Sequence, residues 1–157
     1  MSKLCIKVFL ILLIITNLAA CTSKSENTSK EISIERINKK ITQVVDISEL
    51  TKGDENKLDK LYGIKKENIE DFVLYLPPSN IEASEILLIK VKDKTSIDSI
   101  KEKIAKRVEK KSEIFKDYLP EEYYLVEKHV LESKNQYILF SIHKEGNKVQ
   151  KAFDESF

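Results

Sequence analysis

The spacing of apolar residues changes repeatedly along this chain, and these changes limit the folds available to it. Ile34, Ile37 and Ile41 recur at helical spacing after Ser33, a residue type that favours the N-cap position. From Phe72 the period becomes two, as expected of a β-strand that buries one face. The chain must therefore combine helices with strands.

The spacing of apolar residues and the residue types at helix ends predict the order of helices and strands through to the C-terminus. Gly63 is expected to end the second helix, and a capping box at residues 95–98 is expected to begin the longest one. The expected elements are helices at 34–44 and 54–62, strands at 72–76 and 85–92, a helix at about 97–115, strands at 125–132 and 136–143, and a helix at 149–157 that Asn147 could cap.

This order predicts an α+β fold. Two hairpins would form a four-stranded antiparallel sheet, and the helices would pack on one face of it. The unit of a helix followed by a hairpin occurs twice, each time near a Leu-Pro pair (Leu76-Pro77 and Leu119-Pro120). An internal duplication and a chance repetition both explain this.

The first 20 residues have the three parts of a bacterial export signal. Lys3 and Lys7 supply positive charge, residues 8–15 form an unbroken apolar run, and Ala19-Ala20 ends the segment with small side chains. As a helix this run would span about 12 Å, well short of the ~30 Å hydrocarbon core of a bilayer. We therefore expect residues 1–20 to be cleaved rather than retained as a transmembrane anchor.

The residues Leu18-Ala19-Ala20-Cys21 resemble the lipobox of bacterial lipoproteins. The resemblance implies cleavage before Cys21 and a diacylglyceryl group on its sulfur, and two acyl chains, such as palmitate, anchor a protein stably. Residues 22–30 contain no apolar side chain, which predicts a flexible tether. We thus expect a signal peptide at 1–20, a lipidated Cys21 with its tether at 21–30, and one domain at 31–157 on the extracytoplasmic face of the cell membrane.

Charge argues against nucleic acid as a partner. The chain has 27 basic and 26 acidic residues, and removal of residues 1–20 leaves 25 against 26. Such a balance provides no field of one sign to attract a polyanion. Only Arg36 and Arg107 are arginines, the residue type best suited to bidentate phosphate recognition.

Common catalytic chemistry has few candidates in this sequence. If Cys21 is acylated, no thiol remains for nucleophilic catalysis, and the chain has no GxSxG, SxxK or glycine-rich phosphate loop. The two histidines, His129 and His143, would need to share a face to bind a metal. A hairpin turn centred on Lys134-Asn135 would place them on different faces, so we expect no metal site and no cofactor.

Two acidic clusters offer carboxylates for general acid and base catalysis. They are Glu67, Glu70 and Asp71 in one segment and Glu121 and Glu122 in another. The simpler interpretation is that they belong to solvated loops and helix starts.

Three tyrosines, Tyr118, Tyr123 and Tyr124, surround Pro120. They either pack at the edge of the core with their hydroxyls in solvent or form a patch that binds a partner. The sequence favours the first interpretation and leaves the second open.

Several segments resemble an uncharacterised family of domains in Gram-positive lipoproteins, over roughly residues 45–157. They are LDKLYGI, EDFVLYLP, ASEILLIKVKD, YLPEEYYLV and KAFDESF. The resemblance implies a domain of unknown function and assigns no catalytic residue.

The function we expect is a non-enzymatic binding or interaction module, with an unidentified protein or envelope ligand as partner. The alternative is an envelope-associated hydrolase that uses the acidic clusters.

Overall fold

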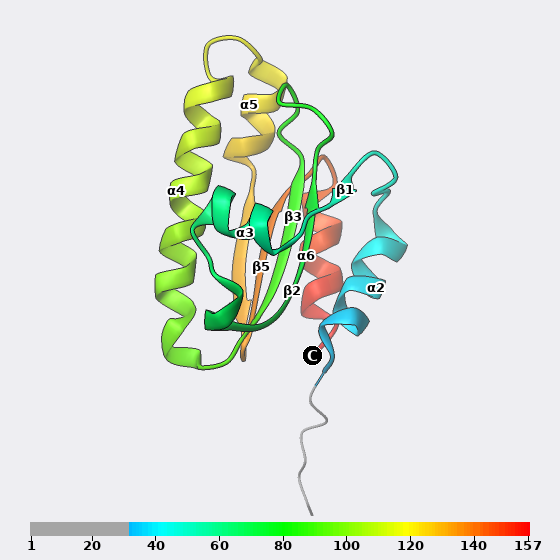
Figure 1. Cartoon of the computed structure of the whole chain (residues 1–157). Coiled ribbons are helices and arrows are strands. Elements are labelled where there is room, and N and C mark those ends of the chain that lie inside the picture. Colours follow the sequence, from blue (N-terminus) through cyan, green and yellow to red (C-terminus); the bar gives the residue numbers. More distant parts are fainter. Residues whose placement is uncertain (1–31) are drawn as a thin grey trace, which may run out of the picture. The chain divides into compact units, whose positions relative to one another are not determined.

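The computed structural model describes residues 32–157, and these residues form an antiparallel sheet with helices on both faces (Figure 1). The strand order is β1-β2-β3-β5-β4. The strands are β1 (Thr51–Lys52), β2 (Ile69–Leu76), β3 (Glu85–Val91), β4 (Val130–Lys134) and β5 (Tyr137–Ile142). The α-helices are α2 (Ile34–Val44), α3 (Glu55–Tyr62), α4 (Ile97–Phe115), α5 (Pro120–Glu127) and α6 (Gly146–Asp154), and 3-10 turns lie at Lys66–Asn68 and Lys94–Ser96.

The α+β class and the antiparallel sheet are confirmed, but the sheet has five strands rather than four. The additional strand, β1, pairs Thr51 with Leu76 at the edge of the sheet. Gly53 follows it, and its N–H donates to the Leu74 carbonyl at 2.9 Å. A Cβ on Gly53 would lie 2.7 Å from the Leu74 side chain, so this approach needs glycine. Two exposed residues have no alternating pattern, which explains why β1 was not predicted.

The prediction that helices cover one face is wrong, because the central strands are apolar on both faces. Every residue of β3 and β5 is buried. Leu87 and Ile89 face a cluster shared with α3, α4 and α5, whereas Ile86 and Leu88 face a second cluster shared with α2 and α6. A strand buried on both sides reads as a continuous apolar run, and it needs a layer of helices on each side.

The second hairpin is shorter than predicted, and the segment before it is helical. Residues expected to begin a strand at Leu125 belong to α5 instead, with Pro120 at the first helical position. The hairpin pairs Lys134 with Tyr137, so its turn lies one residue later than predicted. Asn135 adopts a positive φ of 57° there, a conformation that asparagine tolerates.

Most of the predicted helix ends are confirmed. Ser33 caps α2 and Asp54 caps α3, while Gly63 ends α3 in the left-handed region. The capping box before α4 does not form: Asp93 accepts from Thr95 N–H, and Ser96 donates its hydroxyl to the Asp93 carbonyl. The cap position before α6 is Glu145 rather than Asn147.

Candidate interaction site at the α5 end of the sheet

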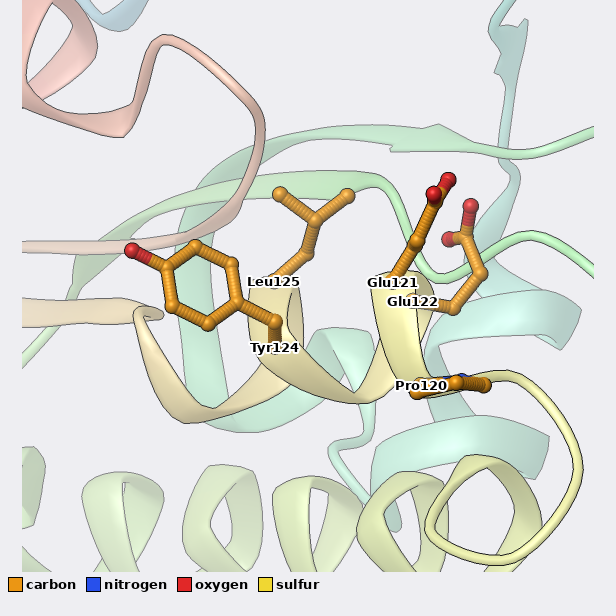
Figure 2. A pocket seen from close by; sticks show the side chains of 5 residues that line it. All are labelled: Pro120, Glu121, Glu122, Tyr124 and Leu125. Atoms are coloured by element: carbon orange, nitrogen blue, oxygen red, sulfur yellow. The ribbon is translucent and has the colours of Figure 1, made fainter.

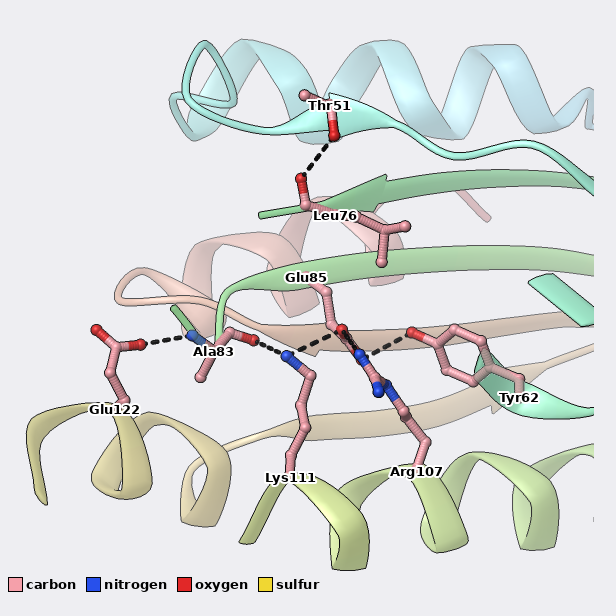
Figure 3. A network of polar contacts seen from close by, with 8 residues as sticks. All are labelled: Thr51, Tyr62, Leu76, Ala83, Glu85, Arg107, Lys111 and Glu122. Carbon is pink, nitrogen blue, oxygen red and sulfur yellow. Dashed lines mark hydrogen bonds and ion pairs between the residues drawn. The ribbon is translucent and has the colours of Figure 1, made fainter. Parts of the chain in front are cut away.

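Three segments converge at the end of the sheet where β3 begins: the last turns of α4, helix α5, and the loop 77–84 between β2 and β3 (Figure 1). Ala83 in the loop joins them. Its N–H donates to the Glu122 carboxylate of α5 at 2.6 Å, and its carbonyl accepts from Lys111 Nζ of α4 at 2.7 Å (Figure 3). One loop residue therefore fixes α5 and α4 relative to the sheet.

A buried ionic cluster lies beneath this junction. Glu85, the first residue of β3, has no exposed surface. It accepts hydrogen bonds from the Tyr62 hydroxyl at 2.8 Å and from Arg107 at 3.2 Å and 2.9 Å, and Lys111 Nζ lies 3.0 Å from it (Figure 3). A buried carboxylate is tolerated in a protein only when it is paired and hydrogen-bonded, and both conditions hold here.

The protonation of this cluster follows from its burial. Burial and the Glu85 charge raise the pKa of Tyr62 well above its ordinary value of 10.0, so its hydroxyl remains a donor. Burial lowers the pKa of Lys111, and Glu85 opposes that shift. Burial also tends to lower the pKa of Arg107, but the hydrogen bond and charge of Glu85 outweigh it and raise that pKa. The cluster thus holds Tyr62, Arg107 and Lys111 around the Glu85 carboxylate.

This cluster was not predicted from the sequence, although the sequence contains a signal for it. Glu85 begins a strand in which Lys90 is the other charged residue, and Lys111 lies among the buried residues Ile100, Ile104 and Phe115 of α4 rather than off the apolar stripe. A charge at a core position predicts a buried partner of opposite sign. The pattern alone, however, did not reveal which partner.

The outer surface of the junction carries several exposed apolar side chains. Among residues 32–157, six large hydrophobic side chains are exposed, and four of them lie on these three segments or on the connection between α4 and α5. They are Ile81 (66% exposed) in the loop, Ile114 (55%) on α4, Tyr118 (84%) between the helices, and Tyr124 (59%) on α5. Tyr123 packs against the core instead. The three predicted tyrosines therefore divide: one supports the core and two face solvent.

Two hollows adjoin α5 and share Tyr124 and Leu125. The first, of about 460 Å³, is lined by these two residues and by Pro120, Glu121 and Glu122 (Figure 2). The second, of about 580 Å³, extends past Lys128 to the start of α6, where Lys144 and Lys148 line it. The surface is therefore acidic at the start of α5 and basic beyond its end.

The two acidic clusters predicted from sequence lie at opposite ends of β3. Glu70 accepts from Lys90 Nζ at 2.7 Å near the end of this strand, whereas Glu122 binds Ala83 just before its start. Seven residues of extended chain separate Ala83 from Lys90, or about 23 Å. The clusters therefore cannot act on one substrate bond.

The two histidines have different surroundings. His129 follows α5, with Nδ1 2.8 Å from the Val126 carbonyl and its ring against Phe140. His143 follows β5, where its Nδ1 accepts from Glu145 N–H at 3.0 Å, and burial lowers its pKa. Within residues 32–157 no three His, Cys, Asp or Glu side chains are grouped as metal ligands would be.

Cys21 and its tether lie outside the described residues, so the predicted lipid attachment at Cys21 remains a prediction. Across residues 32–157 no helix has both the length and the apolar character needed to cross a bilayer.

Comparison with known proteins gives one match. The model of a family described as a domain of unknown function, DUF4358, matches residues 43–143. The match begins at the end of α2 and includes every strand together with α3, α4 and α5, while α6 follows it. Neither the curated proteins nor the solved structures searched contain a match. Because the family model covers well over half of the sequence, the chain belongs to the DUF4358 family, whose function is unknown.

Proposed function

We propose that this protein is a lipid-anchored, extracytoplasmic binding module whose contact surface is the exposed end of the sheet around α5. The concentration of exposed apolar side chains on α4, α5 and the loop 77–84 carries this proposal. Soluble monomers rarely gather large hydrophobic side chains at one end unless that surface contacts something. The lipobox-like residues before Cys21 support the anchor.

Ile32 and the proposed contact surface lie at opposite ends of the sheet. Its carbonyl accepts a hydrogen bond from the Tyr137 hydroxyl, and Tyr137 begins β5. The proposed contact surface adjoins Glu85, which pairs with Ile142 at the other end of β5. The chain therefore enters the domain at the end opposite to the contact surface.

The alternative, a hydrolase using the acidic clusters, has less support. Carboxyl groups that act as a catalytic pair lie about 5–9.5 Å apart in glycosidases, far less than the separation along β3. Within the second cluster, Glu122 already accepts from Ala83 N–H. Glu121 and Glu122 are also adjacent on a helix, where neighbours in sequence diverge.

Photo-crosslinking in living cells tests the proposal. A photoreactive amino acid is placed at Tyr118 or Tyr124, and control chains carry it at the exposed positions Lys39 on α2 or Lys57 on α3. We expect a discrete adduct from the two tyrosine positions and none from the controls. Equal labelling at all four positions, or no adduct at any of them, would refute the contact surface.

A further inference from the structure

We propose that the α5 surface binds a positively charged polypeptide segment that carries apolar anchor residues. This inference rests on the proposed function, because it names the class of partner for the same surface. It follows from three observations: the local charge, the apolar hollow, and the end of the domain at which the chain enters.

The charge near Ile114 and Tyr118 is acidic, although the chain as a whole is balanced. Beside Tyr124, in contrast, Lys128 Nζ lies 5.7 Å from the centre of the tyrosine ring. From the last turn of α4 to the end of α5, residues 112–127 include five carboxylates and a single base, Lys116. The loop 77–84 adds Glu82 and no base. Most of this negative charge lies in one stretch of sequence, and the balanced overall composition conceals it. Such a patch attracts and orients a basic partner.

Part of this charge is available to a partner. Glu113, Asp117 and Glu121 are exposed, whereas Glu122 is engaged with Ala83. In sequence these three carboxylates flank Ile114 and Tyr118, which are exposed on the same stretch of chain. An apolar centre with a charged rim is the usual anatomy of a protein interface.

The hollow beside α5 supplies a place for an anchor. Tyr124 and Leu125 form its apolar part and Glu121 lies on its acidic side (Figure 2). An aliphatic or aromatic side chain would fit the apolar part while a neighbouring lysine or arginine met the carboxylate. Of these two hollows, only the adjoining one is lined by lysines, at Lys128, Lys144 and Lys148, so the partner's basic end would lie toward the start of α5.

Other occupants fit less well. A second copy meeting through the same patch would bring two acidic rims together, which is repulsive. A bilayer with anionic lipids would repel the rim too, and Ile32 enters at the opposite end of the sheet. A nucleic acid is excluded by the sign of the charge.

Binding to model peptides tests the proposal. Both hydrophobic clusters are made by residues 32–157, so a chain beginning at Thr22 retains the folded unit. Its affinity is measured for an amphipathic peptide of leucine and lysine and for a matched peptide in which glutamate replaces lysine. We expect saturable binding of the lysine peptide, weakening with ionic strength, and none of the glutamate peptide.

Substitutions locate the site. Asp117→Lys with Glu121→Lys, and separately Tyr118→Ala with Tyr124→Ala, should each weaken binding of the lysine peptide by about tenfold or more. Asp154→Lys with Glu155→Lys reverses two exposed carboxylates at the end of α6, on the opposite side of the sheet, and should change the affinity by less than about twofold.

Three results would overturn the inference: equal binding of both peptides, an equal effect of the α6 control, or self-association of the chain through α5. If in-cell crosslinking at Tyr118 and Tyr124 still gave an adduct, the contact surface would stand and only the basic partner would be refuted. If crosslinking failed as well, the proposed function itself would fall.

Discussion

At the scale of single residues, Glu85 has the most constrained environment in residues 32–157. Its carboxylate is fully buried and contacts Tyr62, Arg107 and Lys111 from two different helices. Ion pairs of this kind rarely add net stability compared with apolar packing, but removal of one partner leaves the others buried without compensation. We infer that the cluster sets how α3 and α4 dock on β3.

Glu85→Gln tests this role. The substitution keeps the shape but leaves Arg107 and Lys111 buried without a counter-charge, so we expect a loss of about 3–5 kcal/mol in the free energy of unfolding. Urea unfolding measures it. Glu109→Gln, at an exposed position of α4, serves as the control and should change stability by about 0.5 kcal/mol or less. If both variants unfolded alike, Glu85 would have no such role.

Tyr62→Phe should show a characteristic dependence on pH. The raised pKa of Tyr62 means that the folded chain keeps this proton to a higher pH than the unfolded chain, whose pKa is near 10.0. The stabilisation that the hydroxyl provides is therefore complete below pH 10 and is lost as the pH rises above it. We expect wild type to exceed Tyr62→Phe by about 1.5–3 kcal/mol at neutral pH, with the difference shrinking at alkaline pH. A difference independent of pH would contradict the assignment.

At the scale of elements, α5 and α6 show why one short helix is predicted and another is not. Val149, Ala152 and Phe153 follow helical spacing, and all three are buried against the sheet and α2. In α5 the apolar and aromatic residues run consecutively from Tyr123 to Val126, a pattern that also fits a buried strand. Only Val126 of that helix is fully buried, so periodicity could not identify it.

Phe153→Ala tests the docking of α6. The side chain is fully enclosed, and its ring packs against Phe157 with centroids 5.2 Å apart. Truncation in such a site costs about 3–5 kcal/mol. Asp154 is exposed, and its ion pair with Lys134 is a solvent-accessible one at 3.7 Å, so Asp154→Ala should be nearly neutral. Equal and negligible effects in urea unfolding would mean that α6 does not stabilise the fold.

At the scale of the whole molecule, the proposed function has two parts, a lipid anchor at Cys21 and a contact surface around α5. The N-terminal segment through Cys21 is read from sequence, while the surface around α5 exists only in the folded chain. The two proposals are therefore independent, and each can fail without the other.

Cys21→Ser tests the anchor. If Cys21 is acylated, the wild-type protein should partition with membranes and carry the added mass of at least a diacylglyceryl group. The variant should accumulate as uncleaved precursor or lose its lipid anchorage, and fractionation with mass spectrometry measures both. Unchanged membrane partition of a normally cleaved variant would contradict lipid attachment at this residue.

The sequence by itself determined the features that depend on residues close to one another along the chain. Periodicity and backbone preference predicted the helices α2, α3, α4 and α6, the caps at Ser33 and Gly63, and the pairing of β2 with β3. The same holds for membership of a family without assigned function, because a family match depends on residues in order.

Tertiary structure alone decided what depends on contacts between distant residues. Strand β1 exists because Gly53 lets the chain approach Leu74 closely, and the second helical layer exists because β3 is apolar on both faces. The Glu85 cluster joins residues from Tyr62 to Lys111, and the acidic surface joins Glu82 to Glu121. No local pattern encodes such neighbours, since burial and charge density are properties of the packed chain rather than of any segment.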